Sequence, residues 1–449
     1  MRYTPFPHQI EGAIFLADRE RALLASEPRV GKTGSAIMAA DYNLEEKILV
    51  ITTASGRPVW KRAFGDWSPF NRNVQVIAKD SDKLKAEVAI VGWGGITNPK
   101  IRSMLLNRKW DRIISDEDHF AKSYEAARTR SLYGEPHEGG KLLNTSTALM
   151  HAAEERVWAL TGTPQPHNPG DWYPRLRALK PGCLQAHDGM PDVTTYEAFM
   201  QRYTIRRPKK ISQWKKIMVV MGGQNLPELR TRIGDFMLRR TQQDVGIREP
   251  IYETLPLAVS PSMRREVEGS LDAKTVLEAA EAGDTRALDM HLGPLRRLTG
   301  EIKARAVVEA VKDEFDCGLD KIVLAYWHKD VGDVLAAGLS TYGVVRLDGS
   351  TSAKDRSTAE EKFRDPRYRV FLGQIQAAGE AIDLSAAAVM YFVETSFTPK
   401  DMSQMSKRVT NHNQARQPMV KVCVLDGSVD EAMQKILMRL WTAIREVVS

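Results

Sequence analysis

The sequence predicts an α/β protein with two parallel-sheet lobes and a helical insertion between them. Short apolar runs rich in β-branched residues alternate with helical patterns in residues 1–184, and residues 301–449 repeat this plan. The intervening residues 185–300 are more charged and carry helical patterns. Parallel strands, which are buried on both faces, have such uninterrupted apolar runs. Their alternation with helices is typical of α/β domains.

Each expected strand is a few residues long and is followed by small or polar residues. In the first lobe, the expected strands are residues 47–53, 88–93, 111–118 and 157–163. In the second lobe, they are residues 321–327, 344–349, 369–374, 389–394 and 420–426. Helices are expected at residues 331–343 and 353–364, between strands of the second lobe. A chain of 449 residues is long enough to build two or three domains of this kind.

The expected insertion, residues 185–300, contains a strongly basic stretch. No acidic residue occurs from Ala198 to Pro227, whereas Lys and Arg occur there seven times. The formal net charge of the whole chain is +7, so the rest of the chain is balanced. Such a stretch is either a solvated loop or a surface for a polyanion such as nucleic acid. Further along, residues 261–283 have a helical pattern.

Cysteine usage and hydropathy argue against several protein classes. Cys183, Cys317 and Cys423 lie far apart, without a CxxC pair or a Cys/His cluster, so neither a zinc site nor a disulfide framework is expected. The first residues contain no apolar segment typical of a signal peptide. A later apolar run is interrupted by Glu380 and Asp383. We therefore expect no membrane span and a reducing, cytoplasmic location.

The string LLASEPRVGKT has the pattern of a phosphate-binding loop between an apolar run and a helix. In such a loop, Gly31 lets the backbone approach a phosphate, Lys32 reaches the β- and γ-phosphates, and the Thr33 hydroxyl holds Mg²⁺. The amino-terminal amides of the following helix attract the same anion. Ser26 stands where the strict GxxxxGK[ST] pattern has glycine, and Arg29 adds a positive charge. The loop predicts a nucleotide site with ATP and Mg²⁺ as cofactors.

A second motif of the expected nucleotide site ends the strand predicted at residues 111–118. Asp116 and Glu117 are adjacent carboxylates there. Paired acids at a strand end suit metal-assisted hydrolysis, in which Asp116 would bind Mg²⁺ and Glu117 would orient or deprotonate the attacking water. An acidic turn is the alternative for the pair by itself, but the phosphate-loop pattern upstream in the same lobe favours a nucleotide site.

Ordered motifs along almost the whole chain resemble the Swi/Snf-related branch of the superfamily-two helicase-like ATPases. Besides the phosphate loop, the matching strings are FPHQIEGAIFL (6–16), ITTASGRPVWKRAFGDW (51–67), DEDH (116–119), LTGTP (160–164), FMLRRTQQDV (236–245), VVRLDGSTSAKDRSTAEEKFR (344–364), QAAGEAIDLSAA (376–387) and QMSKRVTNHNQ (404–414). The segment YEAFMQRY (196–203) and the basic stretch after it resemble the annealing-helicase subgroup of this family.

The resemblance implies two RecA-like lobes with ATP bound in the cleft between them. Lys32 and Glu117 from the first lobe and Arg408 from the second would be catalytic, and Gln9 would contact adenine. The other residues that we expect near the nucleotide are Arg29, Gly31, Thr33, Gly379 and Asp383.

The resemblance also implies an ATP-driven motor that moves along double-stranded or branched DNA. Such a motor holds DNA mainly through phosphates, so we expect binding that is salt-sensitive and largely independent of base sequence. The candidate DNA-contacting residues are Arg57, Lys61, Thr161, Arg206, Arg207, Lys209, Lys210 and Ser350.

The last motif departs from the family pattern at a position that bears on catalysis. The family has two arginines three residues apart, whereas this chain has Arg408 followed by Asn411. Because an arginine at the γ-phosphate stabilises the transition state, we expect slower hydrolysis unless Arg416 takes the second place. Three other functions stay open: a nucleotide-gated DNA-binding module with weak or no hydrolysis, an RNA helicase, and the motor part of a restriction or modification assembly whose nuclease or methyltransferase is a separate chain. The small size of the chain favours a bacterial or viral source.

Overall fold

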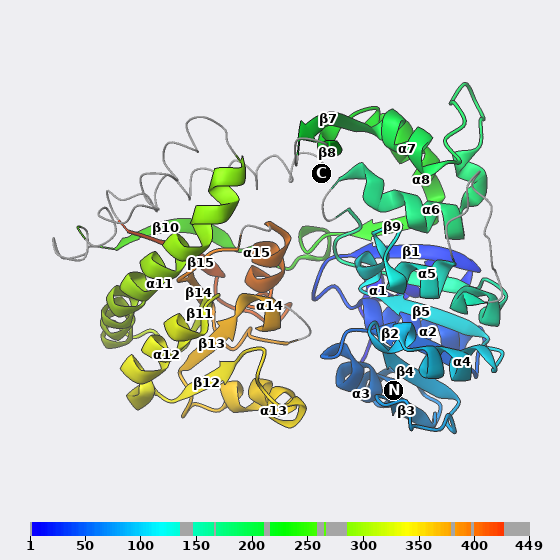
Figure 1. The fold of residues 1–449 in the computed structure, drawn as a ribbon. Coiled ribbons are helices and arrows are strands. Elements are labelled where there is room, and N and C mark those ends of the chain that lie inside the picture. The colour runs from blue at the N-terminus through cyan, green and yellow to red at the C-terminus, as the bar shows by residue number, and fades with distance from the viewer. Residues whose placement is uncertain are drawn as a thin grey trace. The chain divides into compact units, whose positions relative to one another are not determined.

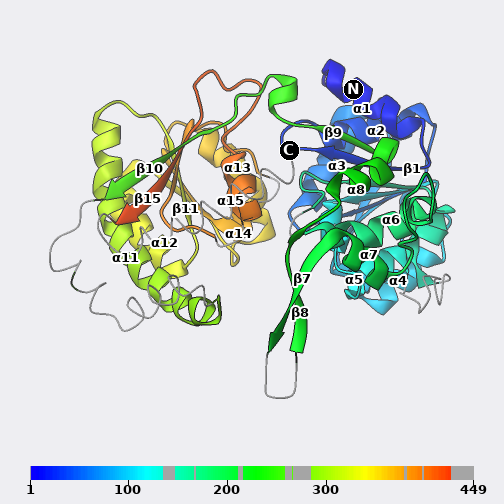
Figure 2. The same cartoon turned by 90° about the horizontal axis from the view of Figure 1, so that it is seen from above.

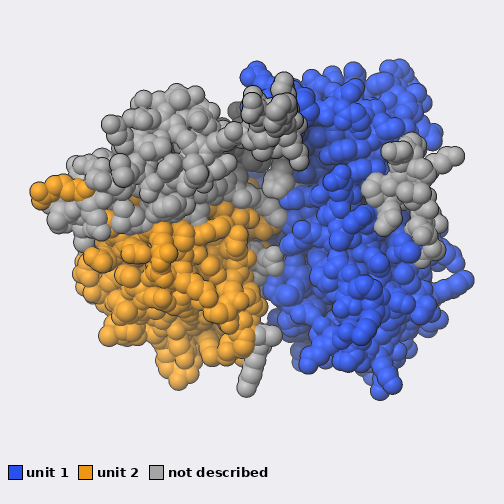
Figure 3. All heavy atoms as spheres, in the orientation of Figure 1, with its two compact units in different colours: residues 1–245 blue, residues 246–449 orange. Residues whose placement is uncertain are grey.

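The computed structural model describes residues 2–134, 147–165, 168–210, 216–257, 265, 285–378, 382–396 and 399–425. The chain divides into two compact units, residues 1–245 and 246–449, which Figure 3 shows in different colours. Each unit contains one parallel sheet between helices (Figure 1). The predicted fold class, two parallel-sheet α/β lobes, is therefore confirmed.

The sheet of the first unit has the strand order β3-β4-β2-β5-β6-β1-β9, and every neighbouring pair is parallel. Its strands are β1 (Arg21–Ser26), β2 (Ile48–Thr52), β3 (Val74–Ile77), β4 (Val88–Gly92), β5 (Arg112–Asp116), β6 (Val157–Leu160) and β9 (Met237–Arg240). All five residues of β2 are buried. Leu49 and Ile51 pack into the core on one face of the sheet, whereas Ile48 and Val50 pack into the core on the other.

Helices cover both faces of this first sheet. The helices that pack on the face of Ile48 and Val50 are α1 (Pro7–Ala17), α2 (Lys32–Tyr42) and α3 (Gly56–Trp67). Those on the opposite face are α4 (Pro99–Leu106), α5 (Ala127–Tyr133), α6 (Tyr173–Leu179), α7 (Tyr196–Tyr203) and α8 (Leu226–Ile233). Because each βα connection starts at the carboxyl end of a strand, the loops that begin α2 and α3 lie at the same edge of the sheet.

The sheet of the second unit has the order β10-β15-β14-β11-β13-β12, again with parallel pairs throughout. Its strands are β10 (Ile251–Leu257), β11 (Ile322–Tyr326), β12 (Val344–Leu347), β13 (Val370–Gln374), β14 (Val389–Phe392) and β15 (Met419–Leu425). Helices α11 (Thr285–Asp316) and α12 (Lys329–Gly338) pack on one face. Helices α13 (Ala353–Arg364), α14 (Ile375–Ala378) and α15 (Pro399–Ser406) pack on the other.

The domain boundaries predicted at residues 184 and 300 differ from the observed division. Residues 185–245 belong to the first unit because Phe199 and Phe236 are buried in its core and β9 extends its sheet beside β1. Strand β10 joins the second sheet through β15. The helical pattern predicted for residues 261–283 lies outside the described residues, apart from Arg265.

The basic stretch is not helical, which corrects the predicted helical insertion at this point. Strands β7 (Thr204–Lys210) and β8 (Lys216–Gly223) pair antiparallel as a two-stranded ribbon, which projects from the first unit in Figure 2. Strand β8 contains Ile217, Val219 and Val220, and β7 begins with Thr204 and Ile205; these β-branched residues favour extended backbone over helix. In the described part of the chain, no helix combines the length and the hydropathy that a membrane span requires.

Candidate nucleotide site and DNA-contacting residues

The phosphate-loop sequence connects the end of β1 to the start of α2. Gly31 has a φ of +94°, in the left-handed region that favours glycine. A Cβ at this position would also lie 2.0 Å from the Gln9 Nε2 atom. Glycine is therefore required at residue 31, and the predicted adenine contact, Gln9, lies directly against the loop. Arg29, at the middle of the loop, is half-buried and also has a positive φ, +72°.

Lys32 is the first residue of α2, and its side chain folds back into the loop. The Nζ atom donates to the carbonyl oxygens of Ser26 at 2.7 Å and Glu27 at 3.4 Å. Thr33 follows as the second residue of the helix and is half-buried. The lysine ammonium, the Thr33 hydroxyl and the amino-terminal amides of α2 thus share one place, where the helix dipole favours an anion.

A segment distant in the sequence, which contains Gln242, holds the phosphate loop through hydrogen bonds. The Gln242 side chain is completely buried and donates from Nε2 to the carbonyl oxygen of Pro28 at 2.9 Å. The Gln242 backbone amide donates to Glu27 Oε2, and the Glu27 amide donates to the Arg240 carbonyl, both at 2.9 Å. Gln242 lies in the FMLRRTQQDV string, but no local sequence signal indicates this contact, because it joins residues 214 positions apart.

Asp116 ends β5 near the loop lysine. Its Oδ2 atom accepts hydrogen bonds from Thr52 Oγ1 and Trp60 Nε1, both at 2.8 Å. Burial and the neighbouring Glu117 carboxylate raise the pKa of Asp116 to about 6, while these hydrogen bonds and the charge of Lys32 act in the opposite direction. Trp60 is buried in the core of the first unit, and its indole N–H also fixes the orientation of Asp116.

Glu117 begins a chain of polar contacts that leads to β6. Its backbone has a φ of +50°, and its Oε2 atom lies 3.1 Å from His119 Nδ1. The same ring nitrogen shares a hydrogen bond of 3.0 Å with Thr161 Oγ1. The Thr161 amide in turn donates to the carbonyl of Leu24 in β1. The acid pair is thus linked through the end of β6 to the strand that carries the phosphate loop.

Asp118 holds this segment in place from inside the unit. Its carboxylate is buried and accepts from Arg175 Nε at 2.6 Å and Ser115 Oγ at 2.7 Å, as well as from the Tyr133 hydroxyl. Because the Asp118 carboxylate is fully paired, it is a structural member of the acidic motif rather than a second metal ligand.

The donor set at this edge of the sheet suits Mg²⁺. The hydroxyl of Thr33 and the carboxylate of Asp116 offer the hard oxygen ligands that this ion prefers. A cation would also relieve the repulsion between Asp116 and Glu117 that contributes to the raised pKa of Asp116. Among the described residues there is no cluster of three or more His, Cys, Asp or Glu side chains that could hold a metal.

In the second unit, the residues predicted near the nucleotide form a network of their own. Asp383 accepts from the Ser385 hydroxyl at 2.7 Å and from Arg364 Nη2 at 3.2 Å. The Asn411 side-chain amide donates to Asp383 Oδ2 at 3.4 Å and to Ser385 Oγ at 3.3 Å. Asn411 is therefore held within its own lobe by two long hydrogen bonds.

The two arginines of this region have different surroundings. Arg408 is 7% exposed and lies close to the Asp383 network, since its carbonyl accepts from the Leu384 amide at 3.0 Å. Arg416, the possible substitute for the second arginine, forms an ion pair with Asp320 at the surface. Gly379, which was also predicted near the nucleotide, lies outside the described residues.

Family comparisons agree with the motifs that build these two sites. A family model for the SNF2-related domain matches residues 8–266, which is more than half of the chain. The chain belongs to the SNF2-related family. A second model, the helicase conserved C-terminal domain, matches residues 306–413.

Curated relatives of this SNF2-related chain align with 98% of its length. A Xenopus tropicalis protein named SWI/SNF-related matrix-associated actin-dependent regulator of chromatin subfamily A-like protein 1 is 28% identical, with 44% of its own length covered. The mouse DNA annealing helicase and endonuclease ZRANB3 is 25% identical, with 40% covered. The chain therefore spans less than half the length of these two relatives. Both come from animals and lend no support to the predicted bacterial or viral source.

The solved structure of the Sulfolobus solfataricus SWI2/SNF2 ATPase core in complex with dsDNA is also similar. It is 20% identical, with a TM-score of 0.44, and the alignment covers 98% of this chain and 91% of that one.

The candidate DNA-contacting residues of this SNF2-related chain have different degrees of exposure. Lys61 on α3 is exposed, and Arg57 on the same helix is half-buried. Ser350 is exposed, with its hydroxyl donating to Asp348. Thr161 is completely buried and bonded to His119, so its assignment as a DNA contact is wrong. Its side chain lies inside the first unit.

The four candidates in the basic stretch all lie on β7. Arg206 forms a two-pronged ion pair with Glu197 at 2.6 and 3.0 Å, so it is already neutralised. Arg207 is exposed. Lys209 and Lys210 pair through their backbones with Ile217 and Lys216 of β8, and their side chains lie outside the described part of the structure.

Proposed function

We propose that this chain is a DNA-stimulated ATPase that works as a translocase on duplex or branched DNA. The observation that carries the proposal is the common edge where the phosphate-loop lysine, the Asp116-Glu117 pair and the Gln9 amide meet. Membership of the SNF2-related family supports it. The names of the two curated relatives, a chromatin regulator and an annealing helicase, support DNA as the substrate class.

Hydrolysis would use the first unit in the following way. The amides at the start of α2 bind phosphate oxygens, and the Lys32 ammonium exchanges the carbonyl of Ser26 for the β- and γ-phosphates. Thr33 and Asp116 would hold Mg²⁺, which would neutralise charge on the phosphates. Glu117 orients the attacking water and accepts its proton. Arg408 is proposed to stabilise the transferred phosphoryl group.

The contacts that lead away from Glu117 suggest how hydrolysis is coupled to movement. His119 shares a hydrogen bond with Thr161, whose backbone is bonded to β1 beside the phosphate loop. A change at Glu117 when the γ-phosphate leaves would therefore shift the end of β6. Exposed basic residues such as Lys61 and Arg207 would contact DNA phosphates without reading bases.

The test compares two lysines that occupy the same position in the two lobes. Lys32 begins α2 directly after β1, and Lys329 begins α12 directly after β11. Lys32→Ala should lower the DNA-stimulated ATPase rate at least 100-fold, since the phosphates lose their cation. Lys329→Ala should leave the DNA-free rate within about twofold, because no phosphate loop precedes it. The rates are measured with duplex, single-stranded and forked DNA and with structured RNA.

Equal rates for wild type and Lys32→Ala would refute the proposed site. DNA binding with no ATPase stimulation in the wild type would favour the nucleotide-gated binding module, for which Asn411 is the motivating residue. Stronger activation by structured RNA than by duplex DNA would favour an RNA helicase.

A further inference from the structure

The β7–β8 ribbon is a separate structural feature of the first unit. Its strands pair from Thr204 with Gly223 to Lys210 with Lys216, and Figure 2 shows them extending away from the helices around α7. A two-stranded ribbon has no second layer to bury its side chains, so it is marginally stable without support at its base. The ribbon therefore depends on how its root is held.

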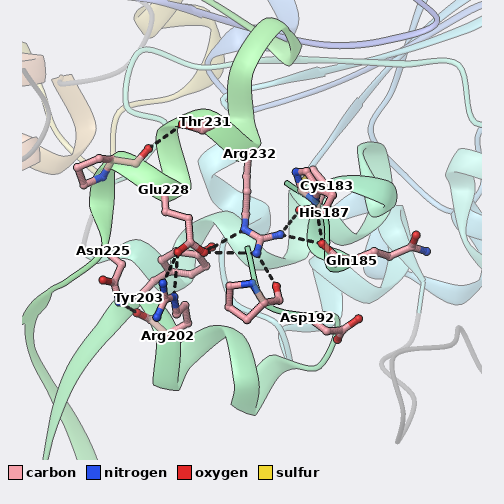
Figure 4. Close-up of polar contacts among 12 residues, drawn as sticks. Cys183, Gln185, His187, Asp192, Arg202, Tyr203, Asn225, Glu228, Thr231 and Arg232 are labelled. Atoms are coloured by element: carbon pink, nitrogen blue, oxygen red, sulfur yellow. Dashed lines mark hydrogen bonds and ion pairs between the residues drawn. The ribbon is translucent and has the colours of Figure 1, made fainter. Parts of the chain in front are cut away.

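The root is fixed by a buried network centred on Glu228 and Arg232 (Figure 4). Arg232 has no exposed side-chain surface and donates to the carbonyl oxygens of Cys183, Gln185 and Pro191. Glu228, just after β8, accepts from the Tyr203 hydroxyl at 2.6 Å and from Arg202, both just before β7. Both strands are thus tied to each other and to the body of the first unit.

Beyond this root, the ribbon exposes apolar side chains to solvent. Ile205 is 46% exposed, Met218 52% and Met221 62%. Met221 lies at an irregularity in the pairing, because Ile205 pairs with Gly222 whereas Arg206 pairs with Val220. Such a bulge redirects a side chain out of the regular pattern of the strand.

The same ribbon carries a positive charge with no acidic residue between Ala198 and Pro227. Arg207 is exposed on β7 beside these apolar residues. The ligand that matches this surface is both polyanionic and able to offer a flat apolar face. A DNA branch point has both properties, since its arms carry phosphates and its terminal base pair exposes an unstacked face.

We propose that the β7–β8 ribbon is a pin that engages the branch point of branched DNA. The basic side chains contact the backbone of the arms, and Met218 and Met221 pack against the exposed base pair. This inference rests on the proposed function, because it assigns the element that distinguishes branched from linear DNA. Continuous duplex is a poorer ligand for the pin, since the methionines would first have to unstack a base step.

The experiment compares Met218→Ser/Met221→Ser with the control Tyr42→Ser/Leu44→Ser. The control removes two side chains of the same unit that are even more exposed, at 79% and 73%, and that lie outside the ribbon. Binding of each protein is measured to a three-way junction and to a linear duplex of equal length, both with 2-aminopurine beside the central position. The wild type should prefer the junction and change the fluorescence there.

The ribbon variant should lose about tenfold in junction affinity and lose the fluorescence change, with its duplex affinity within about twofold of wild type. The control variant should behave as wild type. If the ribbon variant and wild type bind the junction with equal affinity, the proposed pin is refuted. The exposed apolar surface would then be assigned to a protein partner. A wild type whose ATPase is not stimulated by any DNA, but whose junction binding still depends on the methionines, would refute the proposed motor and not the pin.

Discussion

The two parallel sheets of this chain use the same βα connection for different purposes. In the first unit, β1 leads through the phosphate loop into α2, which begins at Lys32. In the second unit, β11 leads into α12, which begins at Lys329. Both connections place amino-terminal helix amides at the carboxyl edge of a sheet, where an anion is favoured.

In the second unit, the protein supplies that anion itself. Glu394, which follows β14, is completely buried and accepts from the backbone amides of Trp327 and His328 at 2.7 and 2.8 Å. Its other oxygen lies 2.6 Å from His328 Nδ1. Gly300 of α11 leaves room for this carboxylate, because a Cβ there would lie 2.7 Å from Glu394 Oε1. The second βα turn is thus occupied by the chain's own carboxylate, whereas the phosphate loop of the first unit is the turn that we propose binds a nucleotide.

Among the variants that test this comparison, Glu117→Gln should have the largest effect, and this effect is on the rate of ATP hydrolysis. An amide keeps the shape of the side chain but cannot accept the proton of water, so the rate should fall about 100- to 10,000-fold. Binding of ATP and the midpoint of urea denaturation should change little. Single-turnover hydrolysis and nucleotide titration separate these effects. A variant that loses ATP binding in parallel with the rate would show that Glu117 has a structural role instead.

For Glu394→Ala in the second unit, we expect an effect on stability. Removing this carboxylate leaves two buried amides and the His328 ring without their acceptor, which should cost about 3 kcal/mol of unfolding free energy. Hydrogen exchange measured by mass spectrometry should show faster exchange in β11 and the start of α12, with the first unit unchanged. Unaltered protection of these peptides would mean that the carboxylate does not substitute for an anion there.

The sequence predicted the sheet strands whose apolar runs are uninterrupted. Strands β2 and β11, buried at every residue, lie within the predicted ranges. The basic strand β9 was not predicted, because its place in the sheet comes from pairing with β1, more than two hundred residues earlier in the chain. Strand propensity that depends on such a neighbour cannot be found from local composition.

The same distinction between local sequence and contacts distant in the chain applies to the candidate site. Lys32, Asp116 and Glu117 could be proposed from the sequence because each belongs to a short motif with its own chemistry. Gln242 could not, because its contact with the phosphate loop joins residues 214 positions apart. The error on Thr161 has a related cause: a threonine in a DNA-coupled motif suggests exposure, but its burial depends on packing against His119. The effect of Asn411 on the rate stays a prediction.

The smallest expected effect concerns the pH dependence of the ribbon root. Burial would raise the pKa of Glu228, but hydrogen bonds from Arg202 and Tyr203 outweigh it and lower the pKa below 4.5. A lowered pKa in the folded state means that the stabilisation is complete above the ordinary value and is lost as pH falls through the folded value. The root should therefore keep its protection against amide hydrogen exchange at pH 5 and lose it only in stronger acid.

Glu228→Gln removes the charge at every pH and should weaken the root by about 1 kcal/mol at pH 7. Hydrogen exchange of the Gln224 amide, which donates to the Tyr203 carbonyl at 3.0 Å, reports on this root directly once intrinsic exchange rates are corrected for pH. The difference between wild type and variant should be constant from pH 7 to 5 and should shrink below pH 4.5. If the exchange difference between wild type and Glu228→Gln already disappears near pH 6, another titrating group stabilises the root. Glu228 would then not be the residue that anchors the ribbon.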